Sequence, residues 1–421
     1  MVPAWPFPCL PAGALIEEPH LETLKALLEG LDVMTAQKVP SEKSNFRVLD
    51  LRDVPHDFWS IWATESYEGD CSVPVTTQEQ AVKTCPASGE ETRFMVVTEF
   101  KIMKKGFNEC DEYLLEWAQG RRNVIHLCCN KLRSWNSTLH LASSIWGQVN
   151  LGCIRELQLS EWCLEFIQDI EFHLGTMTNL HKLMLEEIRN SYNRATSVES
   201  TIKVLASTVF RAQHIRYLCL NDLCLLRNNL EKLFRNLDTR LETLSIASCW
   251  LSQADLDYLA HWPNICELKH LSLRDFIPES CPELLGVLLK RVASTLQTLD
   301  LEQCGLNDCH FNAILPALSH CSHLTKINFY YNNISLVVLK KLLHHTAKLS
   351  QLTEELYPAP RECYEEVIIL RDRFEQLCPE LLDILRAQRQ PKAVSLAIPC
   401  FQCGHSCYYD LEARFCLCQQ V

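Results

Sequence analysis

The apolar pattern of the segment LQTLDLEQCGL, from Leu296 to Leu306, recurs along the chain. Apolar residues take its first, fourth, sixth and eleventh positions, and a cysteine or asparagine takes the ninth. Leu241 and Leu324 begin close copies, LETLSIASCWL and LTKINFYYNNI. Shorter copies of the first six positions begin at Ile154, Leu180, Ile215 and Leu268, and two further ones at Phe46 and Val124.

Successive copies from Ile154 to Leu324 begin 26, 35, 26, 27, 28 and 28 residues apart. This interval is typical of the leucine-rich repeat, in which each unit makes one strand, turns at the Cys or Asn position and returns through a helix. No unit can bury its apolar face alone, so neighbouring units must stack. The pattern therefore predicts an α/β solenoid of the ribonuclease-inhibitor type, a horseshoe with a parallel concave sheet and convex helices.

The segments between the copies have the spacing of helices that bury one face. Phe311, Ile314, Leu315 and Leu318 follow one copy at helical intervals. We expect three regions: an N-terminal helical cap at 1–45, a repeat domain at 46–355 with a flexible insertion at 64–93, and a C-terminal helix with a cysteine-rich cap at 356–421.

Composition narrows the range of functions. The 421 residues are 47% hydrophobic, and a formal net charge of −12 would repel a phosphate backbone, so we expect no direct nucleic-acid binding. The chain has no apolar run of the roughly 20 residues that span a bilayer, and its N-terminus does not have the pattern of a signal peptide. We expect a cytoplasmic or nuclear protein, or both, whose 23 cysteines are mostly thiols.

The residues that alternate with the buried leucines of each strand should face the open concave side. They mix aromatic and charged groups, which suits recognition of a client protein. The alternative is a simply solvated sheet. The candidates are Tyr217, His270, Arg274, Asp300, Glu302, Lys326, Asn328 and Tyr330.

The C-terminal tail contains two cysteine pairs. Cys400 and Cys403 form C-x-x-C, and Cys416 and Cys418 form C-x-C. Four thiolates suit tetrahedral zinc, although C-x-C is not the usual second half of such a site. Reduced thiols in a terminal cap and a redox pair are the alternatives. Zinc here would be structural, and we expect no cofactor to be required.

The motifs typical of hydrolases, metalloproteases, P-loop enzymes and dinucleotide-binding enzymes do not occur in the chain. We therefore expect a binding protein and not an enzyme.

Several segments resemble the PRAME family of leucine-rich repeat proteins. They include AWPFPCLPAGAL, HLETLKALLEGLDV, VLDLRDVPHDFWSIWA, TLQTLDLEQCGL, EELYPAP, IPCFQCG and YDLEARFCLC, and they follow in order across nearly the whole chain. The resemblance implies a substrate-recognition subunit of a cullin-2 RING ubiquitin ligase, docked through elongin B and elongin C, that promotes proteasomal degradation of a client.

The same resemblance implies an alternative role as a non-degradative binder. This would be a transcriptional corepressor that works with a nuclear receptor of the retinoic acid type, or a steric inhibitor, acting against differentiation and apoptosis. In the family a segment before the AWPF segment carries the elongin-binding box, and we expect this chain, which begins Met1-Val2-Pro3, to have no counterpart of that box. We therefore transfer no elongin-binding residues to this chain.

Overall fold

The computed structural model describes residues 21–36, 47–52, 94–135, 145–189, 198–276, 281–365, 368–399 and 406–410. The chain divides into two compact units. Unit 1 comprises residues 1–162 and 169–181, and unit 2 comprises residues 163–168 and 182–421. The expected insertion at 64–93 and the four candidate zinc ligands lie outside the described residues.

Unit 1 contains a parallel sheet with the strand order β1-β2-β3-β4. In the region expected to form an N-terminal helical cap, α1 buries Leu24, Leu28 and Leu31. Strand β2 has no L-x-x-L-x-L pattern and was not expected, yet it pairs with both β1 and β3. The elements are α1 (Leu21–Ala36), β1 (Val48–Asp50), β2 (Phe94–Ile102), α3 (Glu109–Gln119), β3 (Ile125–Trp135), the 3-10 helix η1 (Leu151–Cys153) and β4 (Glu156–Ser160); α5 (Leu164–Leu174) crosses the division between the units.

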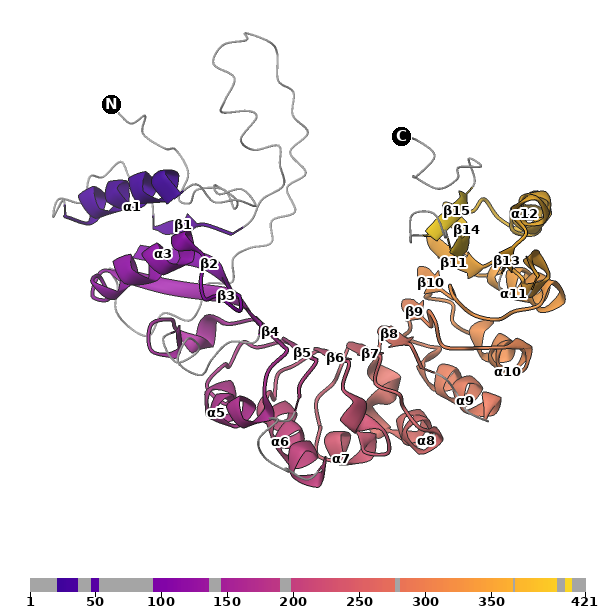
Figure 1. Cartoon of the computed structure of the whole chain (residues 1–421), viewed down its shortest axis with the longest axis horizontal. Coiled ribbons are helices and arrows are strands. Elements are labelled where there is room, and N and C mark those ends of the chain that lie inside the picture. The colour runs from indigo at the N-terminus through magenta and orange to yellow at the C-terminus, as the bar shows by residue number, and fades with distance from the viewer. Residues whose placement is uncertain are drawn as a thin grey trace, which may run out of the picture. The chain divides into compact units, whose positions relative to one another are not determined.

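Unit 2 alternates strands with helices, as the repeat predicts. In this unit the strands follow the inner side of an arc and the helices lie outside them (Figure 1). Strands β5 to β11 and β14 pair in parallel in that order, and β15 is antiparallel to β14. The strands are β5 (Lys182–Glu186), β6 (Tyr217–Asn221), β7 (Thr243–Ala247), β8 (His270–Arg274), β9 (Thr298–Asp300), β10 (Lys326–Asn328), β11 (Glu354–Pro358), β14 (Ala393–Pro399) and β15 (Ser406–Asp410).

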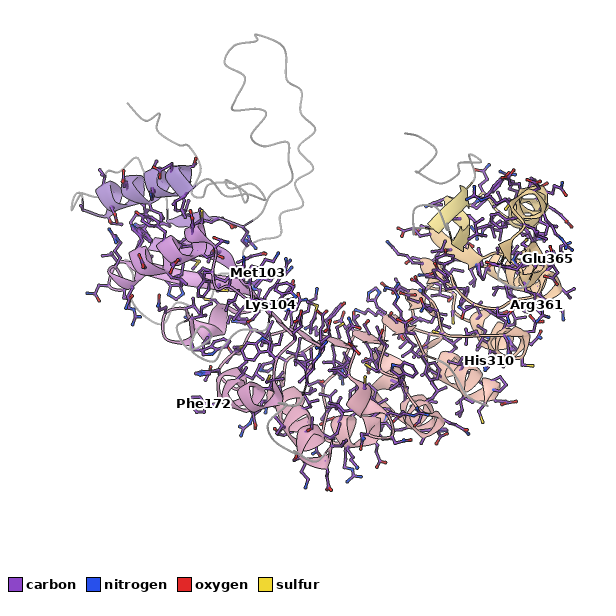
Figure 2. All side chains as sticks on the ribbon, in the orientation of Figure 1. Met103, Lys104, Phe172, His310, Arg361 and Glu365 are labelled. Carbon is purple, nitrogen blue, oxygen red and sulfur yellow. The ribbon has the colours of Figure 1, made fainter. Side chains whose placement is uncertain are left out.

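The connections of unit 2 are mainly helical. They are α6 (Val198–Arg211), η2 (Cys224–Leu226), α7 (Leu230–Phe234), α8 (Gln253–His261), η3 (Pro263–Glu267), α9 (Pro282–Val292), α10 (Asp308–Leu318), α11 (Leu336–Thr346), η4 (Arg361–Cys363) and α12 (Arg371–Arg386); the short strands β12 (Tyr364–Glu365) and β13 (Ile368–Ile369) form a separate pair. Gly286 allows α9 to approach α10, since a Cβ there would lie 2.7 Å from the carbonyl oxygen of Ala313. Figure 2 shows His310 and Arg361 among these helices, where Arg361 pairs with Asp308 at the start of α10.

The turns after the strands are held by the Cys or Asn position, as expected. The Cys304 thiol donates to the Leu273 carbonyl of the preceding repeat. In the next repeat the Asn332 amide donates to the Leu301 carbonyl at 2.7 Å and accepts from the Leu306 amide at 2.9 Å. These bonds satisfy buried backbone groups that water cannot reach, so each turn is fixed to the repeat before it.

The repeat domain extends beyond its expected end at residue 355. Strand β11 crosses that boundary, and β14 adds a further parallel strand after α12. The boundary at 356 is therefore wrong for unit 2. Glu355 occupies the core position of β11, where the repeat pattern has leucine or isoleucine in the other strands. Because that leucine is missing, the leucine spacing does not identify β11 as a repeat strand.

Candidate functional site

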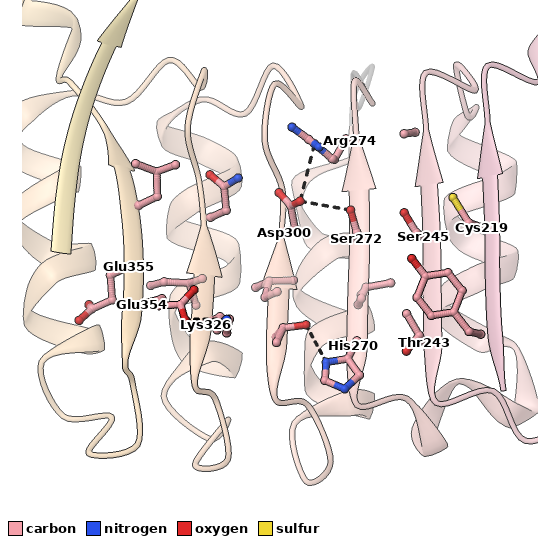
Figure 3. A pocket seen from close by; sticks show the side chains of 18 of the residues that line it. Cys219, Thr243, Ser245, His270, Ser272, Arg274, Asp300, Lys326, Glu354 and Glu355 are labelled. Atoms are coloured by element: carbon pink, nitrogen blue, oxygen red, sulfur yellow. Dashed lines mark hydrogen bonds and ion pairs between the residues drawn. The ribbon is translucent and has the colours of Figure 1, made fainter. Parts of the chain in front are cut away.

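A groove of about 1000 Å³ runs along the sheet face of unit 2, from β6 to β14. We call it the sheet groove. The groove is lined mainly by side chains that alternate with the buried leucines and rise from the open face of the sheet (Figure 3). Six of the eight predicted concave residues line it: Tyr217, His270, Arg274, Asp300, Lys326 and Asn328.

The strand register sorts most of the lining into rows, because residues aligned across a parallel sheet point to the same face. A short row holds Asn221, Ala247 and Arg274, and two longer rows run beside it. The first row is Tyr217, Thr243, His270, Thr298, Lys326 and Glu354. The second row is Cys219, Ser245, Ser272, Asp300, Asn328 and Leu356. Rings and charges thus dominate one row, and short side chains occupy the first half of the other.

Ion pairs hold the charged end of the groove. Arg274 pairs with both Asp300 and Glu302, with 3.6 Å between Arg274 Nε and Asp300 Oδ2. Lys326 Nζ lies 2.6 Å from Glu354 Oε1. Burial raises the pKa of Asp300, and the neighbouring Arg274 partly offsets that rise.

At the other end of the groove, the lining residues on β6 and β7 are uncharged. His270 Nδ1 lies 2.9 Å from Thr298 Oγ1, and burial together with the nearby Lys269 lowers the imidazole pKa, so the ring is neutral at physiological pH. Burial also raises the pKa of the Cys219 thiol. At the edge of this end, the Lys182 ammonium lies 4.6 Å from the centre of the Tyr217 ring.

Two of the predicted residues differ from the other six. Glu302 does not line the groove. It accepts a hydrogen bond from Asn328 Nδ2 at 2.9 Å and pairs with Arg274, so it holds two residues that do line it. Tyr330 is only 3% exposed and does not line the groove. Its placement on the open face is wrong, because β10 ends at Asn328 and the alternation of the strand ends with it.

Sequence reasoning missed the small members of the rows, Cys219, Ser245, Ser272, Thr243 and Thr298. They obey the same alternation rule, but short neutral side chains carry no chemical signal of their own. It also missed Glu354 and Ser395, because β11 and β14 lie beyond the recognised copies.

Among the residues that the structure describes, no group of three or more His, Cys, Asp or Glu side chains is placed to hold a metal ion. Within the same ranges, every helix falls short of the length and apolar content that a membrane span needs. The candidate zinc ligands Cys400, Cys403, Cys416 and Cys418 belong to the undescribed part, so the zinc hypothesis stays a prediction.

Stacked strand-and-helix units with an open sheet face define a leucine-rich repeat protein of the protein-binding class, which is typically a scaffold for partners and not a catalyst. Residues 94–418 match the model of the PRAME C-terminal domain, and residues 1–59 match the PRAME N-terminal domain. The chain belongs to the PRAME family.

Several curated relatives are similar over nearly the whole chain. Mouse (Mus musculus) Oogenesin-3 is 44% identical over 419 residues, which cover 98% of this chain and 84% of Oogenesin-3. Human (Homo sapiens) PRAME family member 8 is 39% identical over 425 residues, covering 99% and 89%. Among solved structures, the leucine-rich repeat-containing protein LegL7 of Legionella pneumophila matches with a TM-score of 0.40 and 14% identity, over 74% of this chain and 92% of LegL7.

Proposed function

We propose that this protein is the substrate-recognition subunit of a cullin-2 RING ubiquitin ligase and that the sheet groove holds its client. The observation that carries the proposal is the groove itself, into which the six predicted side chains, from the four strands β6, β8, β9 and β10, converge on one open face. A catalyst needs a few groups focused on one reacting atom, whereas this face spreads many contacts over a broad surface. That distribution suits recognition of a folded partner.

The proposed mechanism is proximity. A client held on the groove reacts with the ubiquitin-charged enzyme of the same complex as if in an intramolecular step, so a high effective concentration replaces chemistry by this chain. The hydrogen bonds and ion pairs among the groove-lining side chains support such a role, because side chains fixed before binding lose less conformational freedom when the client docks.

The first test is co-expression of the full chain with tagged elongin B, elongin C and cullin-2, followed by affinity purification and mass spectrometry. Stoichiometric co-purification supports ligase docking. A folded chain that recovers none of the three contradicts it and favours a non-degradative binder, such as a corepressor or a steric inhibitor.

The second test concerns the client. Proteasome inhibition should raise the amount of any protein that co-purifies with the chain, and the double substitution His270→Ala with Lys326→Ala should lower its recovery. Lys290→Ala with His320→Ala is the matched control, since both residues are exposed, Lys290 on α9 and His320 just after α10. Equal losses in both variants would place the client outside the groove.

A further inference from the structure

The sheet groove is asymmetric in a way that restricts its client. At one end, over β6, β7 and β8, the second row consists of Cys219, Ser245 and Ser272, all half-buried. We call these three residues the neutral floor. Figure 3 shows them beside one another on adjacent strands, with Asp300 next in the row. Adjacent strands lie about 4.8 Å apart, so the neutral floor is about 10 Å wide, enough for one aromatic ring.

The charged residues that line the sheet groove are already paired within the protein. Five charged residues line the groove, and each one has an ionic partner: Arg274 with Asp300, Lys326 with Glu354, and Glu355 with Arg389. A charged client side chain would lose its water without gaining an uncommitted counter-ion among these residues, which is unfavourable. The groove therefore selects for an uncharged client group, although the chain as a whole carries a formal charge of −12.

The first-row residues beside the neutral floor include two rings. Tyr217 precedes Cys219 on β6, and His270 precedes Ser272 on β8 and is oriented by Thr298. Aromatic groups pack favourably edge to face or offset against such rings. The hydroxyls of Ser245 and Ser272 can bond the polar end of a tyrosine or tryptophan, residues that often dominate protein interfaces.

We propose that the neutral floor is the anchor site of the client and receives one uncharged aromatic side chain, a tyrosine or tryptophan, from the bound protein. This inference rests on the proposed client-binding function and adds to it the chemical class of the group that is recognised. Arg274 on β8 and Asp300 on β9, which pair with each other, then border the anchor on one side and disfavour acidic and basic residues there.

Cys219 allows the neutral floor to be probed without a client. The folded full chain is equilibrated, in excess 2-mercaptoethanol at pH 8, with disulfides of three acyl cysteamines that end in a phenyl ring, a carboxylate or an ammonium group. Mixed disulfide formation at Cys219 then reports how well each end group fits, because the exchange chemistry is the same for all three. Peptide mapping by mass spectrometry gives the adduct at each cysteine.

We expect the phenyl adduct at Cys219 to exceed each charged adduct about fivefold, which corresponds to about 1 kcal/mol. At the exposed Cys224 and Cys266 the three probes should differ by less than about twofold, the change that about 0.4 kcal/mol produces. Ser245→Leu should fill the site and remove the phenyl preference, whereas Ser245→Ala should keep it, with both variants checked by thermal melting.

Equal adducts at Cys219, a preference for either charged probe, or no adduct there would each overturn the anchor site. None of these results would contradict the proposed ligase role, which is tested separately by co-purification with elongin B, elongin C and cullin-2. Conversely, a phenyl preference in a chain that recovers none of those subunits would leave the anchor site standing while the ligase role fails.

Discussion

Two neighbouring regions of unit 2 fill the same core position in opposite ways. In register across β9, β10 and β11, that position holds Leu299, Ile327 and Glu355, and all three are at most 3% exposed. The first two need only apolar neighbours. Glu355 needs Arg389, which pairs with it from beyond α12, and the Tyr357 hydroxyl, which donates to Oε2 at 2.7 Å. A buried leucine is stable in any apolar layer, whereas a buried carboxylate is stable only among specific partners.

The polar cluster of Glu355, Arg389 and Tyr357 also includes one residue of the helical layer. Thr346, on α11, lies with its Oγ1 2.6 Å from the Tyr357 hydroxyl, and burial raises the pKa of Tyr357 well above its usual value, so the phenol stays protonated and can donate. Burial likewise raises the pKa of Glu355, an effect that Tyr357 and Arg389 oppose. The end of the solenoid is therefore closed by contacts that depend on charge, while the middle depends on packing.

The largest effect is expected where an apolar position is given a charge without partners. Leu299→Asp buries a carboxylate among leucines and also removes packed atoms, so it should lower the free energy of unfolding by more than about 5 kcal/mol. Urea denaturation followed by circular dichroism measures the change. Leu299→Ile, the matched control, should cost less than about 1.5 kcal/mol. A cooperative transition for Leu299→Asp at the wild-type urea midpoint would contradict the strand register.

Removing one partner of the buried pair is the next strongest test. Arg389→Met leaves Glu355 buried without its cation, which should cost about 3 to 5 kcal/mol. The double variant Glu355→Leu with Arg389→Met restores an apolar core position and should recover most of that loss. If Arg389→Met changed the unfolding free energy by less than about 1 kcal/mol, the cluster would not hold β11 as argued.

This loss should depend on pH in a defined direction. Without Arg389 the folded-state pKa of Glu355 rises further above its unfolded value near 4.5, so the folded state binds the proton more tightly than the unfolded state. Stability from the protonated carboxyl is present at low pH and is lost as pH rises through the folded pKa. The deficit of Arg389→Met relative to wild type should therefore grow between pH 5 and pH 8, and Glu355→Gln in the same background should abolish that growth.

The same contrast explains how far the sequence predicts this structure. Leucine spacing locates β4 to β10, because every core position there is apolar and the interval repeats. It misses β2, whose run FMVVTEFKI is apolar without the motif, and β11, whose core carries Glu355 and Tyr357. The alternation rule predicts groove residues correctly within a strand, as at Lys326. It gives a wrong prediction beyond the end of a strand, as at Tyr330. The partner of Glu355 lies 34 residues away, and no local pattern identifies it.

A smaller contrast separates two turns that use different side chains for the same task. The Asn332 amide donates to Leu301 at 2.7 Å and to Phe329 at 2.9 Å, so Asn332→Ala should leave buried carbonyls unpaired and cost about 1 to 3 kcal/mol. Cys304→Ala removes weaker thiol donation and should cost about 1 kcal/mol. Thermal melts of the two variants compare them directly. A larger loss for Cys304→Ala than for Asn332→Ala would reverse the ranking of the two turns.

The smallest effect belongs to the residue directly before Glu355. Glu354 points into the sheet groove and pairs with Lys326, and both side chains are more than half exposed. Water screens such a pair, so Lys326→Ala should change the unfolding free energy by less than about 1 kcal/mol, against about 3 to 5 kcal/mol for Arg389→Met. Urea midpoints of the two variants, measured side by side, test whether burial alone separates these adjacent glutamates. A loss for Lys326→Ala as large as that for Arg389→Met would mean that the exposed groove-lining residues contribute to stability as much as the buried pair does. Substitutions of these residues could then not test client binding independently of the fold.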